Sequence, residues 1–499
     1  MSGPLPGADP YWITLPPKLQ SFVKKGFIAT MKPFFFFLIG AISLSASRSS
    51  ADEFSAGAAT SDITPPMGVP LDGAISQNGE VSQIHDRIQV RALVFSNGKT
   101  KVALATVDNT MISDSIFDAA KKKIKAETGI PGSHVILAAT HTHSTPRGVV
   151  GLIDNPAFAS YLESLPDGIA KAVIAADRNL QPALAGWSSL SAPEHVHNRR
   201  WFVEGVETRQ NPFGETGEVV GMNPGRKGLI KPAGPVDTEL FLLSVQSNEN
   251  KPIAVMGNYG LHYVGGISRG HVSADYFGIF SNAIAKELDA GPEFVGIMSN
   301  GTSGDINAND LTAPARKFKP FERMQFIGED LAKRSAPVVK KIKHREHSSI
   351  SAVETVLKLK VRKPNADRIA WAKETAAPPG YKLRLTRPQV YARETLALAH
   401  YPDTAEVRLQ AVRIGDLAII GIPCEVFAET GLAIKAAKIF PHTFVMELAN
   451  GYHGYLPTAK QHTWGGYETW PARSANLEVD AETKIRAAAL ELLTELSGE

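Results

Sequence analysis

Short apolar runs that end in polar residues recur along this chain, and one of them carries the first candidate residues for a functional site. Residues 135–137 (Val-Ile-Leu) are typical of a buried strand, and the stretch 138–146 follows directly. This stretch contains His141 and His143, which in extended backbone point to the same side. Two imidazoles facing one pocket at a strand end are a common start for a metal site. A loop with two ordinary histidines fits the same residues, so the stretch needs partners elsewhere.

The pattern of apolar and polar positions predicts strands that alternate with helices. Two pairs of strands are expected to form hairpins, because Gly-containing turns separate their members. Strands are expected at 91–95, 102–107, 135–137, 254–259, 293–298, 350–362, 407–413, 417–422 and 443–448, with another beginning at residue 58. Helices are expected at 113–128, 157–176, 276–288, 321–342, 365–375, 387–400, 425–440 and 480–496.

This alternation, with antiparallel hairpins inserted, predicts a fold between α/β and α+β. We expect mixed β-sheets flanked by helices, with an active site at the carboxyl ends of strands. The sequence contains no repeats and no obvious linkers, so a single catalytic domain over residues 54–499 is the simplest organisation.

The N-terminal residues 1–51 have the pattern of an export signal. Lysines precede the apolar run 34–42, and small residues follow it up to Ala51. The run is too short to span a bilayer comfortably, and Met31 is a possible true start. We therefore predict a cleaved signal peptide and a secreted or periplasmic protein, with an uncleaved N-terminal anchor as the alternative.

Composition and charge narrow the class of protein. The 499 residues are 43% hydrophobic and 21% charged, which is ordinary for a globular protein with a large core. The formal net charge of +3 comes from residues 1–51, and no basic stripe in the remainder indicates nucleic-acid binding. The single cysteine, Cys424, excludes an internal disulfide and, by its position, a lipid-modified N-terminal cysteine.

Further polar residues follow other apolar runs. His262 comes after the strand expected at 254–259, and Glu425 after the one expected at 417–422. The segments 299–307 and 450–455 follow the strands ending at 298 and 448. Polar strand ends that meet at one sheet edge commonly build an active site. Taken alone, His262 is more often a structural histidine, and Glu425 a carboxylate at a helix N-terminus.

The order of these motifs closely resembles the neutral/alkaline (non-lysosomal) ceramidase family. His-x-His is followed by Asn-Tyr-Gly-Leu-His, a Ser-Asn-Gly loop with Gly-Asp, Pro-Cys-Glu, and Asn-Gly-Tyr-x-Gly-Tyr. The resemblance runs from about residue 56 to about residue 468. It implies a hydrolase that cleaves the N-acyl amide bond of a ceramide-like lipid with one catalytic zinc ion. The implied partners are a lipid or small-molecule N-acyl substrate and, transiently, a membrane surface, while the oligomeric state is left open.

Matched motif by motif, the resemblance also implies roles for individual residues. The zinc ligands are His141, His262, Glu425 and Tyr455, and His143 handles the proton beside the zinc-bound water. Zinc lowers the pKa of a bound water from ~15.7 toward ~7, which suits it to amide hydrolysis.

Two further residues complete the implied site. Arg199 corresponds to an arginine near the amide, and Tyr467 to a second active-site tyrosine that steadies the oxyanion. Tyr467 follows Tyr455 by the family's interval of twelve positions, which favours Tyr455 over Tyr452 as the ligand.

Two departures from the family pattern leave alternatives. Asn307 stands where the family typically has a serine, and a C-terminal immunoglobulin-like domain is expected to be absent. The zinc mechanism does not need the serine, so we expect activity with an altered substrate pocket. The alternatives are a zinc hydrolase of another lipid ester or N-acyl amino compound, and a non-catalytic binding protein on the same scaffold.

Overall fold

The computed structural model describes residues 53–71, 79–149, 155–377 and 385–498, which form one packed unit. The predicted leader over residues 1–51 lies outside the described residues. In the described part, no helix is both long and apolar enough to cross a bilayer. The single catalytic domain over 54–499 stays a prediction.

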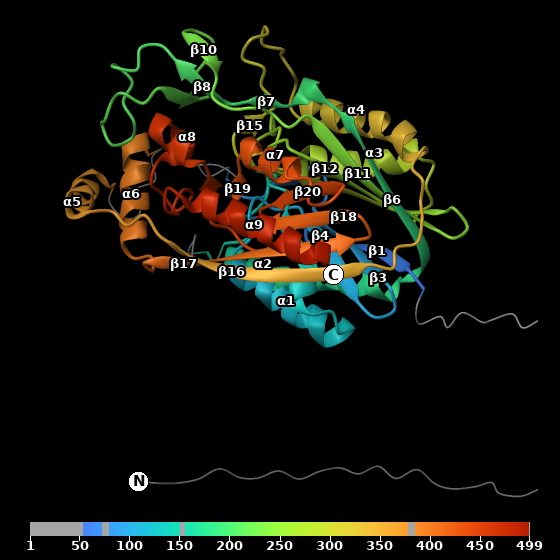
Figure 1. Ribbon diagram of the computed structural model, residues 1–499. Helices are drawn as coiled ribbons and strands as arrows, with labels where there is room; N and C mark the ends of the chain where they lie inside the picture. The colour runs from blue at the N-terminus through green and yellow to red at the C-terminus, as the bar shows by residue number, and fades with distance from the viewer. Residues whose placement is uncertain (1–52, 72–78, 150–154, 378–384, 499) are drawn as a thin grey trace, which may run out of the picture. The chain divides into compact units, whose positions relative to one another are not determined.

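Two mixed sheets form the centre of this unit (Figure 1). The larger has eight strands in the order β14-β12-β11-β6-β1-β3-β4-β5, and the smaller has four in the order β16-β17-β18-β20. The larger sheet comprises β1 (Ser55–Asp62), β3 (Gln89–Ser96), β4 (Lys101–Val107), β5 (Val135–Ala139), β6 (Gln181–Ser191), β11 (Glu239–Ser247), β12 (Pro252–Tyr259) and β14 (Val295–Asn300). The smaller comprises β16 (Ile350–Lys360), β17 (Thr404–Ile414), β18 (Leu417–Ile422) and β20 (His442–Glu447).

Helices cover the outer faces of both sheets. On the larger sheet, α1 and α2 lie over β1, β3, β4 and β5, while α3 and α4 lie over β11, β12 and β14. On the smaller sheet, α9 covers the face turned away from the larger one. The helices are α1 (Asp114–Thr128), α2 (Pro156–Arg178), α3 (Asp275–Glu287), α4 (Glu322–Val339), α5 (Ala366–Thr375), α6 (Arg387–Ala399), α7 (Ala428–Ala436), α8 (Ala459–Trp464) and α9 (Ala481–Gly498).

Short strand pairs surround the two sheets. One three-stranded sheet has the order β10-β8-β9, and three pairs join β13 to β2, β15 to β7, and β19 to β21. Their bounds are β2 (Gln83–Ile84), β7 (His197–Asn198), β8 (Arg200–Val203), β9 (Val220–Met222), β10 (Leu229–Pro232), β13 (His271–Val272), β15 (Ile306–Asn307), β19 (Glu425–Val426) and β21 (Tyr455–Leu456).

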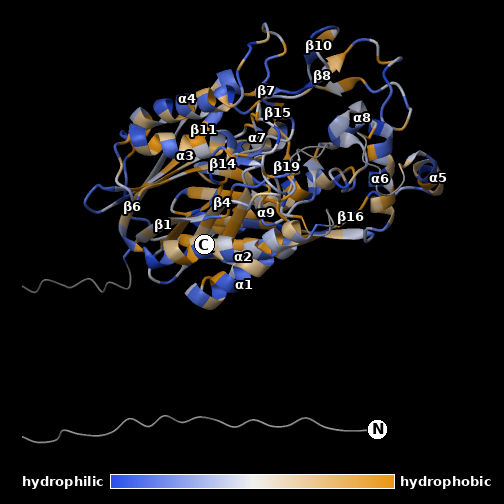
Figure 2. Ribbon diagram, turned by 180° about the vertical axis from the view of Figure 1, so that it is seen from behind, coloured by the Kyte–Doolittle hydropathy of each residue, from blue (hydrophilic) through white to orange (hydrophobic). Residues whose placement is uncertain are grey.

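Strand periodicity explains the layers. Along β11, Phe241 and Leu243 pack into the core between the two sheets, while Leu240 and Leu242 pack toward α3 and α4. Both faces of the strand are therefore buried, which is why its apolar run is continuous. Figure 2 shows the hydrophobic colouring concentrated in the strands and hydrophilic colouring on the outer sides of the helices.

The predicted fold class is confirmed, since mixed sheets flanked by helices are observed. Both predicted hairpins are present as antiparallel pairs, β3 with β4 and β17 with β18. Parallel pairs also occur, β4 with β5, β12 with β14, and β18 with β20.

One predicted helix is much shorter in the structure than expected. The helix expected over 425–440 is α7, which spans only Ala428–Ala436. Glu425 is not at its start, because it lies on β19 and pairs in parallel with Tyr455 of β21. The interpretation of Glu425 as a helix N-terminal carboxylate is therefore wrong.

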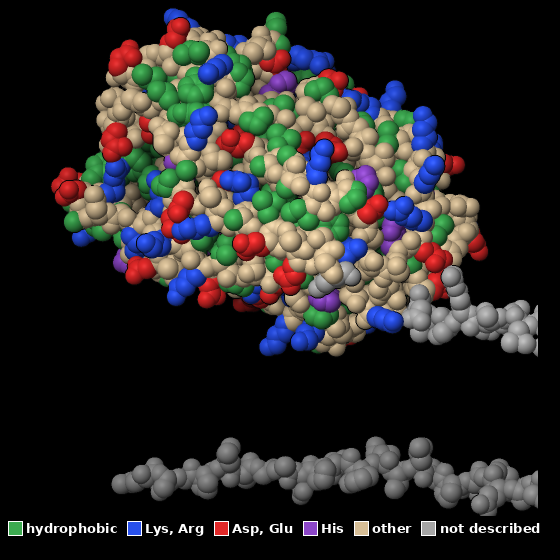
Figure 3. Space-filling view, viewed as in Figure 1, with side chains coloured by type: hydrophobic (Ala, Val, Ile, Leu, Met, Phe, Trp, Pro, Cys, Tyr) green, Lys and Arg blue, Asp and Glu red, His purple; other side chains and the backbone are tan. Residues whose placement is uncertain are grey.

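The two sheets are joined at the ends of β5 and β20. Ala138 forms an antiparallel bridge with Ala449, and the amide of Asn450 donates to the carbonyl of Leu137 (2.7 Å). Leu137 lies near the end of β5, and Ala449 lies just beyond β20. This bridge therefore brings the carboxyl ends of these two strands, one from each sheet, together. On the face shown in Figure 3, basic and acidic side chains are interspersed.

Candidate active site

The pair His141 and His143 lies just beyond the end of β5. The strand ends at Ala139, and His141 has a left-handed backbone conformation with φ of 73°. The prediction that the backbone is extended from His141 to His143 is therefore wrong. The outcome is nevertheless as expected, because Nε2 of His143 lies 3.1 Å from Nε2 of His141.

Backbone carbonyls set the tautomers of His141 and His262. Nδ1 of His141 lies 2.7 Å from the carbonyl of Thr110, and Nδ1 of His262 lies 3.2 Å from that of Ser303. A carbonyl can only accept, so Nδ1 carries the proton in both rings and each Nε2 presents a lone pair. These two Nε2 atoms are buried and 3.0 Å apart. The two nitrogens are close enough together to bind one cation, although Nη1 of Arg199 also lies 3.1 Å from that of His262.

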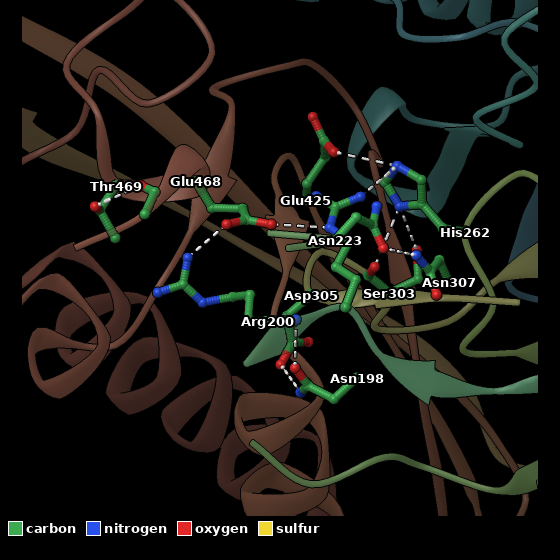
Figure 4. Close-up of polar contacts among 12 residues, drawn as sticks. Asn198, Arg200, Asn223, His262, Ser303, Asp305, Asn307, Glu425, Glu468 and Thr469 are labelled. Carbon is green, nitrogen blue, oxygen red and sulfur yellow. Dashed lines mark hydrogen bonds and ion pairs between the residues drawn. The ribbon is translucent and has the colours of Figure 1, made fainter. Parts of the chain in front are cut away.

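The carboxylate of Glu425 completes this donor set. Its Oε2 lies 3.3 Å from Nε2 of His141 and 3.9 Å from Nε2 of His262 (Figure 4). It is buried and receives no hydrogen bond from the residues that the structure describes. Nitrogen ligands bound to zinc at ~2.0–2.1 Å are about 3.3 Å apart in tetrahedral geometry. The orphaned oxygen and the converging nitrogens therefore fit a zinc ion.

Charge around Glu425 favours its ionised form. Burial raises the pKa of Glu425, but His141, Arg199 and the Tyr455 hydroxyl outweigh burial and hold the pKa below its usual range. The side chain of Tyr452 donates to Oε1 at 3.0 Å, which leaves Oε2 directed at the histidines.

The two candidate tyrosines both reach Glu425. Tyr452 donates to its carboxylate, and the Tyr455 hydroxyl interacts with both Glu425 and Arg199. Burial, reinforced by the charge of Glu425, raises the pKa of Tyr455 well above its usual value. The phenol is therefore protonated in the metal-free site. The geometry leaves the choice of Tyr455 over Tyr452 as a prediction.

His143 stands slightly apart from the other two histidines. It is half-buried, and its ring stacks on Tyr263 with centroids 3.6 Å apart and planes 11° apart. Removal from water lowers the pKa of His143 well below 6.5, and His141, Arg147 and Arg199 lower it further. The imidazole is therefore neutral near pH 7, not poised at its ordinary pKa, and able to accept a proton. His141, His143 and His262 together also form a group close enough to hold a metal ion.

Arg199 is held at the edge of this group by a buried carboxylate. Its Nε donates to Oε1 of Glu468 at 2.8 Å, and Arg200 donates to the other oxygen of Glu468 at 2.5 Å (Figure 4). Nη1 of Arg199 lies 3.1 Å from Nε2 of His262 and donates to its lone pair. Metal binding through this nitrogen requires that hydrogen bond to break.

Tyr467 lies beside Tyr455, with ring centroids 5.6 Å apart in an edge-on arrangement. Burial raises the pKa of Tyr467, so its hydroxyl is a proton donor near neutral pH. Tyr455 begins the short strand β21 and Tyr467 lies in a 3-10 turn at 467–469, so only part of the predicted set comes from strand ends.

The segment 303–307 forms the floor of the site. Asp305 accepts from the amide of Ala428 (2.9 Å) and from Nδ2 of Asn198 (2.7 Å), and burial raises its pKa to about 6. Asn307, in the position of the family serine, donates to Oδ1 of Asn223 at 2.6 Å. Asn307 therefore ties this floor to the segment before β10 (Figure 4).

Several residues of the site were not predicted. Glu468 had a usable signal, since it directly follows Tyr467. Thr110 and Ser303 contribute backbone carbonyls, which no side-chain pattern announces. Tyr263 and Glu447 also had usable signals, since Tyr263 directly follows His262 and Glu447 ends β20, a strand that was predicted.

Fold and site together define an α/β protein with a buried candidate metal centre at the junction of two mixed sheets. The family model described as neutral/alkaline non-lysosomal ceramidase, N-terminal, matches residues 54–325. The chain therefore belongs to this ceramidase family. His141, His143, Arg199 and His262 fall inside the matched range, and Glu425, Tyr455 and Tyr467 lie beyond it.

Individual relatives agree with this family. The chain is 24% identical over 304 residues to neutral ceramidase B of Dictyostelium discoideum, a match covering 55% of this chain and 38% of that protein. Neutral ceramidase A of the same organism is 24% identical over 285 residues, covering 52% and 37%. The matches thus span less than two-fifths of the curated relatives.

Solved structures show the same fold. The neutral ceramidase from Pseudomonas aeruginosa aligns with a TM-score of 0.63 at 16% identity, covering 89% of this chain and 75% of that one. A ceramidase complexed with C2 aligns with a TM-score of 0.64 at 18% identity and the same coverage.

Proposed function

We propose that this protein is a secreted, zinc-dependent amidohydrolase that cleaves the N-acyl amide bond of a ceramide-like lipid. The observation that carries the proposal is the pair of buried Nε2 lone pairs of His141 and His262, 3.0 Å apart, beside the orphaned Oε2 of Glu425. Imidazole and carboxylate are the ligands of catalytic zinc sites that hydrolyse amides.

In this proposal His141, His262, Glu425 and Tyr455 hold the metal. Zinc, when bound, supplies a Lewis acid that activates water and polarises the amide carbonyl. Thr110 and Ser303 keep the two imidazoles in the tautomer that binds a cation. Tyr455 must lose its proton to coordinate, and burial opposes that loss in the metal-free site.

His143 is the proton-handling residue of the proposed reaction. Its lowered pKa keeps the imidazole neutral, so Nε2 can accept a proton from the attacking water. The protonated ring then passes this proton to the leaving amine nitrogen. Stacking on Tyr263 fixes the plane of the ring and hence the direction of Nε2.

Arg199 and Tyr467 orient the substrate amide. The two hydrogen bonds of Glu468 hold the guanidinium groups of Arg199 and Arg200 in place. The hydroxyl of Tyr467 remains protonated and can donate to the developing oxyanion. Arg199 also counters negative charge at Glu425.

The substrate class rests on the relatives. Two curated relatives carry the name neutral ceramidase, and one solved structure is a ceramidase complexed with C2. Hydrolysis of another lipid ester or N-acyl amino compound is the second candidate, because Asn307 alters a position near the site. A transient contact with a membrane surface would give access to a lipid substrate.

Turnover of a panel of substrates tests this proposal. Purified protein supplied with zinc is assayed on N-acylsphingosines of different acyl length, on matched esters and on N-acyl amino acids. We expect hydrolysis of N-acylsphingosine that a chelator abolishes and zinc restores. His143→Ala should lose at least 100-fold in kcat while still binding zinc. Turnover of esters alone would overturn the substrate class, and no turnover of any member would favour a binding protein.

Export is tested separately. Residues 1–51 are proposed to be a cleaved signal peptide, and N-terminal sequencing of the exported protein should find a new terminus near residue 51. Recovery of the uncut chain in the membrane fraction would instead indicate an anchor.

A further inference from the structure

Glu447 is a fully buried carboxylate that the proposed reaction does not use. It is the last residue of β20 in the smaller sheet. Its Oε1 accepts hydrogen bonds from Nδ2 of Asn300 (2.9 Å) and from Oγ of Ser303 (2.6 Å). Its Oε2 accepts from the backbone amides of Ser303 (3.1 Å) and Val426 (2.8 Å). Four donors thus converge on the two oxygens of one side chain.

These donors belong to two segments, one that supports the proposed ligand His262 and one that carries the proposed ligand Glu425. Ser303 follows β14 of the larger sheet, and its carbonyl accepts a hydrogen bond from Nδ1 of His262. Val426 follows Glu425 on β19, and its carbonyl accepts from the amide of Gly304 at 2.8 Å. Glu447 therefore clamps the support of His262 to the segment of Glu425. In Figure 4 the Glu425 carboxylate faces one nitrogen of the His262 ring, and Ser303 lies by the other.

We propose that Glu447 is a positioning residue that holds the lone pair of His262 and the carboxylate of Glu425 at the spacing a single cation requires. This inference rests on the proposed metal site. The loop at 303 follows a strand of the larger sheet, whereas β19 pairs with β21. Loss of the clamp removes the hydrogen bonds through which Glu447 joins the loop to β19. Their ligand atoms are then free to separate.

The chemistry of the four donors explains why two acceptor oxygens are needed. A carboxylate offers acceptor sites on both oxygens, so it satisfies two side-chain donors and two backbone amides together. An amide side chain of the same shape has one acceptor oxygen, and its NH2 group faces the NH2 group of Asn300 across the other half, while the Ser303 hydroxyl can turn and accept from it. Substitution by glutamine therefore sets two donors against each other at Asn300 and reverses the hydrogen bond with Ser303, while nearly preserving volume.

The test is the zinc affinity of Glu447→Gln, measured by competition with a chelating fluorophore. We expect the Kd for zinc to rise about 10–100-fold, which is typical when a group that orients a ligand is lost. The matched control is Glu482→Gln. Glu482 is an equally buried carboxylate that accepts from Thr430 and Arg486 and contacts no proposed ligand.

Metal-free unfolding is measured for all proteins, so that a general loss of stability is separated from a loss of affinity. Glu482→Gln should change stability and leave the zinc Kd within about twofold of wild type. If Glu447→Gln does not fold, Ser303→Ala removes a single hydrogen bond to Glu447 and should still weaken zinc by several-fold.

Each outcome is decisive. An unchanged Kd in Glu447→Gln, or in Ser303→Ala where that variant is needed, would overturn the role of Glu447 and leave the metal site intact. An equal rise in Kd in Glu482→Gln would show a global effect and also overturn it. Absence of zinc binding by wild type would instead contradict the proposed function.

Discussion

Buried charge is concentrated around the site in the residues Arg199, Arg200 and Glu468. All three side chains are at most 5% exposed, and the single carboxylate serves both guanidinium groups. Removing one member of a buried ion cluster leaves an uncompensated charge, which costs more than the cluster contributed. The integrity of this triad should therefore be measurable as stability as well as activity.

We predict that Glu468→Gln lowers the free energy of unfolding by ~3–5 kcal/mol, because two buried guanidinium groups lose their counter-charge. Denaturation by urea measures this change. Glu394→Gln is the control, since Glu394 pairs with the more exposed Arg473 and should cost ~1 kcal/mol or less. Equal effects of the two substitutions would contradict the role given to Glu468.

Lys121 on α1 predicts a pH dependence away from the site. It is buried and donates to Oε1 of Gln410 at 2.9 Å. Burial, reinforced by Arg408, lowers its pKa from 10.5 to about 7. As the pH falls from 10.5 toward 7, the unfolded lysine is protonated and the folded one is not, so stability falls across this window and levels off below it.

The substitution Lys121→Met removes this titration. The free energy of unfolding of the variant should therefore rise relative to that of wild type as the pH is lowered. The difference in unfolding free energy between the two proteins should grow by about 3 kcal/mol from pH 9.5 to pH 7. Urea denaturation at several pH values measures it. A difference that does not vary with pH would show that Lys121 titrates normally in the folded protein.

At this scale the sequence predicted candidate residues better than their conformations. His141, His262 and Glu425 were identifiable because each follows an apolar run. The positive φ of His141 was not, since few non-glycine residues adopt that region and the surrounding contacts decide which of them do.

At the scale of elements, the site depends on a close approach between the 303–305 loop and β19. A Cβ atom placed on Gly304 would lie 2.4 Å from the carbonyl oxygen of Glu425, which is backbone and cannot move aside cheaply. The amide of Gly304 also donates to the carbonyl of Val426. Glycine at this position is therefore what allows the loop and the strand to touch.

Gly304→Ala should destabilise the protein by ~1–3 kcal/mol and weaken zinc binding, because the loop must withdraw from Glu425. Thermal or urea unfolding and a zinc titration measure the two effects. The matched control is Gly291→Ala, where the added methyl group meets open space and should cost under ~0.5 kcal/mol. Tolerance of both substitutions would contradict the packing described for residue 304.

Elements with a strong apolar period were predictable, and those stabilised by their neighbours were not. The hairpins β3–β4 and β17–β18 have clear turn signals and were predicted. The central strand β6 was not predicted, because Pro182, Gly186 and several serines interrupt its pattern. Strand β11 was missed although its continuous apolar run was a usable signal.

At the scale of the whole molecule, two sheets packed face to face bring the carboxyl ends of β5 and β20 to one junction. The core between them contains residues of both, such as Met256 of β12 and Met446 of β20. Sequence periodicity identifies strand ends but cannot say which ends meet, because sheet order and sheet packing are tertiary properties. The family resemblance supplied the grouping of the site residues that periodicity could not.

The proposed metal centre requires that donors from separate strand ends bind one metal ion. Its most direct test is metal analysis of purified wild-type protein, His141→Ala and Glu425→Ala after incubation with zinc and removal of excess metal. His344→Ala is the control, since this half-buried histidine bonds to Ser244 away from the site. We predict about one zinc ion per chain in wild type and His344→Ala, and far less in the other two. Stoichiometric zinc in both site variants, or none in wild type, would show that these residues do not bind the metal.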